Sequence, residues 1–372
     1  MKKFLDCIAI VGATPSKFHG TKKYVSTGAV ATTEIDESEV VEVTYEDRPS
    51  RANLSADAGD ILFAKMQGTR KTLLLDSETE KNIYSTGFYA VRANPEVITT
   101  ECLYYLIDSE LFLAQKDKNC SGATQKAITN GGMAKIEISV PALSEQGILV
   151  DKLKHLTQLI ADKKKQLNLF DEIIKSRFIE MFGNMESNPK GWRQSTLGDE
   201  CYYIKDGPHK SPKYLDSIDG IPFISTRNVV SGDGIDWSTA KYISEADYLD
   251  CIKKCHPEKG DILYSKGGTT GIAKLVDTDI RFANWVHVAV LKFGAQLDGR
   301  FLECMLNMNY CYAQSQALTK GIANKDFVLS AIAQVKIYVP PIELQRKYTE
   351  FVKRTDKSKY HGMFAFEMGV AA

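Results

Sequence analysis

The chain has 372 residues, with 47 basic and 47 acidic side chains and a hydrophobic share of 44%. This length predicts two or three domains, and the composition excludes an intrinsically disordered chain. No segment approaches the 18 or more apolar residues of a membrane span, so we expect a cytoplasmic protein with no membrane partner. The eight scattered cysteines are expected to be reduced thiols. A net charge of zero does not exclude nucleic acid, because a contact surface needs only local charge.

The first 142 residues have the pattern of an α+β module. The apolar run Ile61–Phe63 predicts a strand, and apolar residues at helical spacing predict one helix over Thr100–Asp117. Two polar segments, Ile61–Leu75 and Asn119–Met133, contain lysine but no acidic residue, whereas Glu34–Asp47 holds seven acids and no base. Positive and negative charge are therefore separated within this module.

Residues 143–184 have a different pattern, which predicts one long helix that serves as a spacer and a packing surface. Apolar side chains recur at alternating intervals of four and three, as in a coiled-coil seam. Residues 143–182 would extend about 60 Å at about 1.5 Å per residue. Gly183 and Asn184 are expected to end the helix. The seam includes Leu149, Leu153, Leu156, Ile160, Leu167, Phe170 and Ile174.

The next segment repeats the first module at an offset of about 200 residues. Gly59–Lys65 (GDILFAK) recurs as Gly260–Lys266 (GDILYSK), and Ile136–Pro141 (IEISVP) recurs as Val335–Pro340 (VKIYVP). We therefore expect a second copy of the same domain over residues 185–341. Its sequence again predicts a strand, at 286–293, a single helix, at 299–318, and polar loops without acids, at 262–276 and 304–325. His287 is expected to be a hydrogen-bonded core residue because it lies in a strand pattern.

A second helix begins after this module, at residues 342–359. Its apolar spacing fails near Lys359, so we expect the helix to end there, apparently truncated, with an irregular tail over residues 360–372.

Catalytic motifs are missing from the sequence. There is no phosphate-binding G-x-x-x-x-G-K-[ST] loop, no G-x-S-x-G nucleophile elbow and no N-P-P-[FY] methyltransferase motif. Cys251, Cys255 and His256 have no second ligand pair at zinc-site spacing, so they are interpreted as ordinary residues of the fold. We expect no catalytic residue, no metal and no cofactor.

The loops without acidic residues are the feature of the sequence that favours nucleic-acid binding. They combine Gly, Thr, Gln, Asn and Lys, whose donors and acceptors suit hydrogen bonds to phosphates and to base edges. The alternative is that they are only polar turns. Their recurrence in both modules favours binding.

Several motifs occur in a fixed order along the chain, and some are duplicated. They are the helix entries Val140–Gln146 (VPALSEQ) and Val339–Gln345 (VPPIELQ), the G-D-I-L strand of each module, the Gly122–Lys126 loop, and Pro189–Trp192 (PKGW) with Leu197–Asp199 (LGD) at the start of the second module. In this arrangement the chain resembles, over nearly its whole length, the specificity subunit of Type I restriction-modification systems. The first module lacks a P-x-G-W opening.

This resemblance implies a non-catalytic subunit that recognises DNA. Each domain would read one half of a split double-stranded target, and the helices would act as a ruler and as the dock for modification (methyltransferase) and restriction (translocase-nuclease) subunits. S-adenosylmethionine, ATP and Mg²⁺ would then belong to the partner subunits. The candidate DNA contacts are Lys65, Gln67, Thr69, Arg70, Gln125, Lys126, Arg227, Asn228, Lys266, Thr269, Thr270, Asn324 and Lys325.

Two other functions are compatible with the pattern. One is a protein-interaction scaffold whose twin modules bind protein and whose coiled coil self-associates. The other is the recognition part of a single-chain restriction–methylation enzyme, which predicts a fused catalytic domain for which these residues carry no motif.

Overall fold

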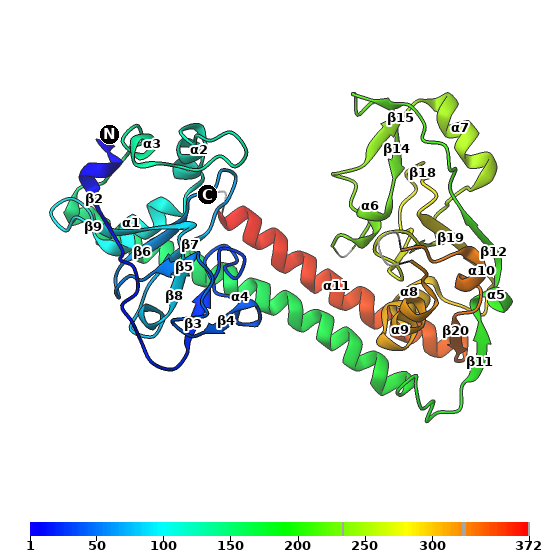
Figure 1. The fold of residues 1–372 in the computed structure, drawn as a ribbon. Coiled ribbons are helices and arrows are strands. Elements are labelled where there is room, and N and C mark those ends of the chain that lie inside the picture. The colour runs from blue at the N-terminus through cyan, green and yellow to red at the C-terminus, as the bar shows by residue number, and fades with distance from the viewer. Residues whose placement is uncertain (233, 322–324, 371–372) are drawn as a thin grey trace. The chain divides into compact units, whose positions relative to one another are not determined.

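The computed structural model describes residues 1–232, 234–321 and 325–370, with side chains of the last helix up to Lys359 (Figure 1). It divides into two compact units, Met1–Asp162 and Lys163–Ala372. The division falls within helix α4 (Leu143–Phe182), so each unit includes part of this helix. The prediction of one uninterrupted helix over residues 143–182 is confirmed.

The first unit contains two four-stranded sheets. One is antiparallel in the order β2-β9-β6-β7, and the other has the order β4-β3-β8-β5 with β3 and β8 parallel. A short pair, β1 with β10, joins the start of the unit to its end. The strands are β1 (Lys2–Lys3), β2 (Ile8–Val11), β3 (Lys22–Val25), β4 (Val41–Val43), β5 (Ala52–Leu54), β6 (Ile61–Ala64), β7 (Thr72–Leu74), β8 (Ile83–Ser85), β9 (Phe88–Ala93) and β10 (Glu137–Ile138).

The second unit repeats this topology. Its antiparallel sheet has the order β12-β19-β16-β17, its other sheet has the order β13-β15-β14-β18, and β11 pairs with β20. The strands are β11 (Arg193–Thr196), β12 (Cys201–Asp206), β13 (Tyr214–Leu215), β14 (Ile221–Ile224), β15 (Lys241–Ile243), β16 (Ile262–Ser265), β17 (Ala273–Leu275), β18 (Ala283–Asn284), β19 (Val288–Phe293) and β20 (Lys336–Val339).

The two sheets of each unit correspond strand by strand, apart from one edge strand. The parallel pair β3–β8 has its counterpart in β14–β18, whereas β5 and β13 lie at different edges. The predicted fold class, two similar α+β domains joined by a long helix, is confirmed. Helices outside the sheets include α3 (Asn130–Met133), α5 (Leu197–Glu200), α6 (Thr226–Val230), α7 (Glu245–Lys254) and α10 (Leu329–Ile332), with 3₁₀ turns at Phe4–Cys7, Glu37–Glu39 and Thr79–Lys81.

The helix predicted in each module is in fact two helices. In the first unit α1 (Thr100–Ile107) and α2 (Glu110–Lys118) are separated because Ser109 caps a new helix, its hydroxyl accepting from the Phe112 amide. In the second unit α8 (Gly299–Asn307) and α9 (Asn309–Leu318) are separated by Met308, which has an extended backbone. The apolar spacing continues across both breaks, so the pattern concealed them.

A buried glutamine attaches each module to the helix that follows it. Gln345, fully buried near the start of α11 (Ile342–Val370), accepts from the Asp298 amide and donates to the carbonyls of Gln296 and Pro340. Gln146 of α4 makes the same three kinds of bond, with Thr99, Val97 and Pro141. The glutamine of the two helix-entry motifs therefore satisfies backbone groups of the loop before α1 or α8.

The end of α4 is fixed by the opening of the second module. The Trp192 indole donates to the Phe182 carbonyl at 2.8 Å, which satisfies one of the last carbonyl groups of the helix. Gly183 has φ of +82°, and a Cβ there would lie 2.7 Å from a Pro189 side-chain carbon. The P-K-G-W opening thus forms the cap of α4.

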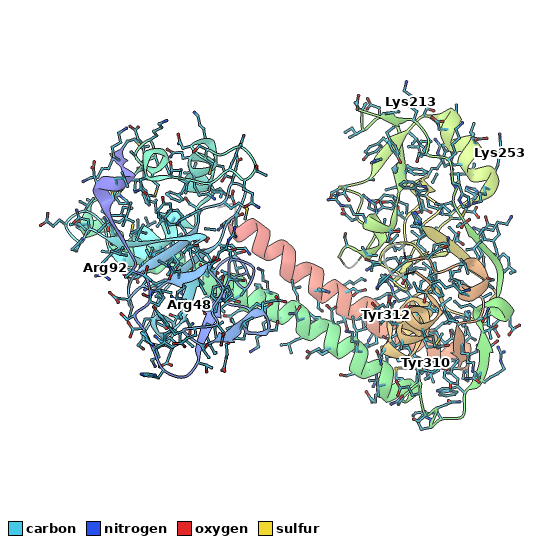
Figure 2. All side chains as sticks on the ribbon, in the orientation of Figure 1. Arg48, Arg92, Lys213, Lys253, Tyr310 and Tyr312 are labelled. Carbon is cyan, nitrogen blue, oxygen red and sulfur yellow. The ribbon has the colours of Figure 1, made fainter. Side chains whose placement is uncertain are left out.

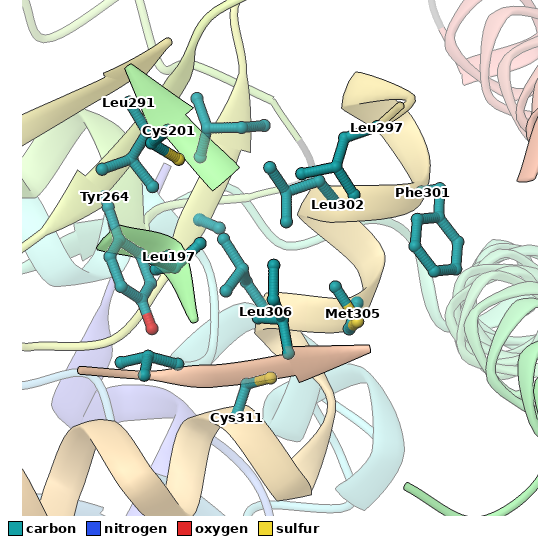
Figure 3. Packing of buried hydrophobic residues seen from close by; sticks show 14 of the residues in the cluster. Leu197, Cys201, Tyr264, Leu291, Leu297, Phe301, Leu302, Met305, Leu306 and Cys311 are labelled. Atoms are coloured by element: carbon teal, nitrogen blue, oxygen red, sulfur yellow. The ribbon is translucent and has the colours of Figure 1, made fainter. Parts of the chain in front are cut away.

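Within the second unit, the end of α4 and the start of α11 pack against each other and against α8. Phe178 stacks on Phe301 with ring centroids 5.7 Å apart, and Tyr348 donates to the Ile174 carbonyl at 3.2 Å. Lys359 pairs with Asp171 at 2.8 Å. The same core continues under the sheet through Leu197, Tyr264, Leu291, Leu302, Met305 and Leu306 (Figure 3).

Helix α11 extends further than its sequence predicted. It continues to Val370, so the expected end near Lys359 and the irregular tail over residues 360–372 are wrong for the described residues up to 370. The apolar seam does fail there, but a seam reports packing against a partner. A backbone helix does not require such a seam, and residues 360–370 contain no proline and include the helix-favouring Met, Ala and Glu.

Candidate nucleic-acid interface

In the first unit, the two polar loops predicted to bind lie side by side. The β6–β7 loop (residues 65–71) and the α2–α3 loop (residues 119–129) are joined by backbone hydrogen bonds. The Gln67 amide donates to the Lys126 carbonyl, and the Ile128 amide donates to the Lys65 carbonyl, both at 2.9 Å. Two segments about 60 residues apart in the chain therefore form one polar surface.

The second unit repeats this connection with the β16–β17 loop (residues 266–272) and the described parts of the α9–α10 loop (residues 319–321 and 325–328). The Gly268 amide donates to the Lys325 carbonyl at 3.2 Å, and the Phe327 amide donates to the Lys266 carbonyl at 2.7 Å. These are the same bonds at equivalent positions. The recurrence of polar loops in the sequence corresponds to a recurrent surface.

A third segment contributes to each surface. It is the turn before β9 in the first unit and the turn before β19 in the second. The amide of Lys65 donates to the carbonyl of Gly87, and the amide of Lys266 donates to that of His287, both at 2.9 Å. In the second unit the Thr226 hydroxyl also donates to the His287 carbonyl, at 3.1 Å, which brings the start of α6 to the same place. We call these two assemblies the loop surfaces of the first and second unit.

Most of the predicted contacts on the first loop surface are accessible. Lys65 is half-buried, donates to the Thr86 carbonyl at 2.9 Å and lies 4.4 Å from the centroid of the Tyr89 ring, and burial lowers the pKa of its amine. Gln67 is exposed, and its side-chain amide donates to the backbone carbonyl of Asp117. Thr69 is half-buried, whereas Gln125 and Lys126 are exposed.

Arg70 is exposed, and its side chain is held by two acidic residues. Its guanidinium forms a two-pronged bond with Asp108, at 3.1 and 2.8 Å, and a further bond with Glu110 at 2.9 Å. The hydrogen bond with Asp108 and the charges of both acids raise the pKa of Arg70. Through these bonds Arg70 holds the loop against the end of α1 and the start of α2.

Three predicted contacts in the second unit are contradicted by their burial. Lys266 is 5% exposed and lies between Asp206 and Asp326, at 3.3 and 3.4 Å. Thr270 is 2% exposed and shares a hydrogen bond with Thr319. Asn228, also 2% exposed, accepts from the Ser225 amide and donates to the Asp236 carbonyl. All three side chains hold the surface together from within.

The remaining predicted positions are mixed. Arg227, Thr269 and Lys325 are exposed, and Asn324 lies outside the described residues. On the predicted helix seam, Leu149, Leu156 and Ile160 are exposed, whereas the half-buried members are Leu153, Leu167, Phe170 and Ile174.

Two residues of the second loop surface were missed by the sequence prediction. His287, expected in the core, is exposed, and its ring centroid lies 5.7 Å from that of Trp285. The flanking Val286 and Val288 are 7% and 0% exposed. Because side chains alternate along an extended chain, this V-H-V sequence was itself a signal that the histidine faces the other way.

Two arginines of the first unit that lie away from the loop surface have partners within that unit. Arg92 (Figure 2) bonds Asp60 at 2.6 Å and Asp57 at 2.8 Å, and Arg48 lies 3.9 Å from the Tyr45 ring centroid. In the described part of the chain no cluster of three His, Cys, Asp or Glu could hold a metal ion. Across the same residues, none of the helices combines the length and apolarity needed to cross a membrane.

The sequence matches a known family over both units. The model for the Type I restriction modification DNA specificity domain matches residues 9–169 and again residues 189–361. The chain belongs to this family. It is a specificity subunit, which is the non-catalytic component of a Type I restriction-modification system.

Relatives and solved structures agree with this assignment. The present chain is 24% identical over 299 residues to the Type I restriction enzyme MjaIX specificity subunit of Methanocaldococcus jannaschii. The match covers 72% of the present chain and 68% of the M. jannaschii protein. The S subunit of a Type I system from M. genitalium has a TM-score of 0.52 at 15% identity, covering 99% of this chain and 91% of that one. A chain from a study of complex assembly in a Type I system has a TM-score of 0.53 at 18% identity, with coverages of 98% and 94%. These structural similarities support the fold.

Proposed function

We propose that this specificity subunit recognises a split double-stranded DNA target, with one half-site read by each unit. The observation that carries the proposal is the duplication of the loop surface. Three chain segments are joined by the same backbone bonds in both units, on the same sheet topology. Two similar surfaces on one chain suit two half-sites, whose separation follows from the protein between them.

The loop surfaces have the chemistry that DNA requires. Exposed lysines at equivalent positions, Lys126 and Lys325, suit phosphates, and neighbouring amide and hydroxyl groups suit base edges. Acidic residues close to these loops are paired with Arg70 and Lys266, which partly offsets their charge.

The helices, on this proposal, dock the methyltransferase and restriction subunits. The predicted seam leaves Leu149, Leu156 and Ile160 between 37% and 44% exposed. Such a row of apolar side chains on a helix suits a protein partner. The chain itself needs no cofactor, because S-adenosylmethionine, ATP and Mg²⁺ act on the partner subunits, and the complex works in the cytoplasm.

Methylome sequencing with and without this gene tests the proposal. Deletion should abolish adenine methylation at one split motif and leave other methylated motifs unchanged, and the intact gene supplied in trans should restore it. The tagged chain should also co-purify with a methyltransferase subunit. An unchanged methylome in a strain that otherwise methylates its DNA would overturn the proposal.

A further inference from the structure

The loop surface of the second unit contains an open cavity of about 610 Å³. It lies where the start of α6, the β16–β17 loop and the turn before β19 meet, and part of the α9–α10 loop borders it. The described lining residues include no carboxylate. They are Ser225, Thr226, Arg227, Gly267, Gly268, Trp285, His287 and Lys325. The nearby Asp326 is paired with the buried Lys266.

The position of His287 in this cavity is built into the backbone. Its carbonyl accepts from the Lys266 amide and from the Thr226 hydroxyl. A Cβ at Gly267 would lie 2.1 Å from Nδ1 of His287, so the imidazole ring covers a backbone position that only glycine leaves open. Gly267 and His287 are thus matched.

The first unit has different residues at the equivalent positions. The bond from the Lys65 amide to the Gly87 carbonyl matches the bond from the Lys266 amide to the His287 carbonyl, so Gly87 corresponds to His287. By the repeat, Gly28 corresponds to Arg227 and Ser85 to Trp285. Three small residues therefore replace arginine, tryptophan and histidine.

The lysines of the two surfaces are equivalent. Lys126 and Lys325 both follow the polar loop after the second helix, and their carbonyls accept equivalent amides. The shared residues suit the part of DNA that is the same in every sequence, which is the phosphate backbone. The residues that differ suit the part that varies, which is the base pairs.

Resting on the function proposed above, we propose that Arg227, Trp285 and His287 form the specificity-determining pocket of the second unit, and that it reads a G·C pair through guanine. Guanine presents two acceptors, O6 and N7, in the major groove, and the arginine fork matches them. Adenine and cytosine present amino donors there, which face the Arg227 donors unfavourably. The Trp285 and His287 rings form the adjacent wall of the pocket.

Methylome sequencing of strains that carry the whole system tests this pocket. Arg227→Ala should relax one G·C position in one half-site, so that methylation at sites with another base pair there rises roughly ten- to hundredfold. His287→Gly, which introduces the residue of the first unit, should alter the same half-site. Arg227→Lys keeps the charge without the fork and should also relax the position.

Two control variants separate reading from general binding. Lys325→Ala should lower methylation about equally at all sites without changing the motif. Arg281→Ala removes an exposed arginine that pairs with Glu245 at 3.0 Å and does not line the cavity, so it should leave the methylome unchanged.

Three results would overturn the pocket assignment. They are an unchanged motif in the Arg227 and His287 variants, a uniform loss of the kind expected for Lys325→Ala, or relaxation in both half-sites. Each variant subunit is first shown to co-purify with its methyltransferase subunit. If no split motif depends on the gene at all, the proposed function fails as well, which distinguishes the two failures.

Discussion

Buried polar side chains hold the loop surfaces in shape at the residue level. Lys116 of α2 is 2% exposed, and its amine donates to the carbonyls of Met66 and Thr69 at 2.7 and 2.9 Å. In the second unit the fully buried Ser315 occupies the corresponding place in the repeat, and its neighbour Gln316 donates to the Thr270 carbonyl at 2.9 Å. The same loop is thus supported from behind by different chemistry in the two units.

Replacing Lys116 with methionine tests this support. The variant keeps an unbranched side chain but leaves two loop carbonyls without their donor, which should cost about 1–3 kcal/mol. Amides of residues 66–70 should exchange faster with solvent, as measured by hydrogen–deuterium exchange, and thermal unfolding should shift downwards. Lys118→Met, an exposed lysine of the same helix, should change neither. Equal loop protection in the Lys116 variant and the unmodified protein would contradict the role.

The sequence identified which loops gather but not which of their side chains remain accessible. Lys126, Lys325 and Arg227 are exposed as a binding role requires. Lys266 is not accessible, because it is buried next to Asp206, and the exposed Arg70 is already paired with Asp108. The lack of acids within a loop is visible in a sequence. Whether an acid from another element approaches the loop depends on the tertiary structure, which the sequence pattern does not show.

At the scale of the elements, local patterns predicted most of the architecture. Helix α4 was predicted to the residue because its seam has no internal cap, whereas Ser109 divides a continuous apolar pattern by capping α2. The glutamines of the two helix entries were visible as a motif. Their role is visible only in the structure, where the side chain of Gln345 forms hydrogen bonds with the backbone of the loop before α8.

An ion pair close to this junction should make the second unit sensitive to acid. Glu200 is 5% exposed and bonds Arg193 at 2.7 Å, and its other oxygen accepts from Gln296. The Arg193 hydrogen bond, against the opposing effect of burial, lowers the pKa of Glu200 to about 2 from its ordinary 4.5. A lowered pKa stabilises the fold above the unfolded-state value, and that stability is lost as pH falls from about 4.5 towards 2.

Urea unfolding at several pH values, followed through the transition of the second unit, measures the contribution of this ion pair to the free energy of unfolding. Glu200→Gln should destabilise the protein by about 2 kcal/mol at pH 7, after allowance for the solvent exposure of Arg193. Because glutamine does not titrate, the variant should also lose less stability between pH 4.5 and 3. Glu343→Gln, in an exposed pair with Arg346, is the matched control and should follow the unmodified protein. Parallel pH profiles for Glu200→Gln and the unmodified protein would refute the assignment.

At the scale of the whole molecule, duplication explains why one chain has two loop surfaces and a long helix after each module. The net charge of zero combines exposed lysines in the loops with acidic stretches such as Glu34–Asp47. A protein without a basic excess has little general attraction for DNA, so its affinity depends on local contacts and on its partners. On the proposed function, the connection between the two units through α4 sets which pairs of half-sites can be read together.

Lengthening α4 therefore should lengthen the unread spacer of the target. A four-residue insertion between Lys154 and Asp162 adds about 6 Å and turns the helix by about 40°. Two base pairs span about 7 Å and turn the duplex by about 70°, so methylome sequencing should find both half-sites unchanged and their spacer longer by about two base pairs. A two-residue insertion at the same point adds about 3 Å, close to one base pair, but rotates the helix by about 160°, whereas one base pair turns the duplex by only about 35°, so it should abolish methylation. An unchanged spacer in the four-residue variant with methylation intact would show that α4 does not act as the ruler.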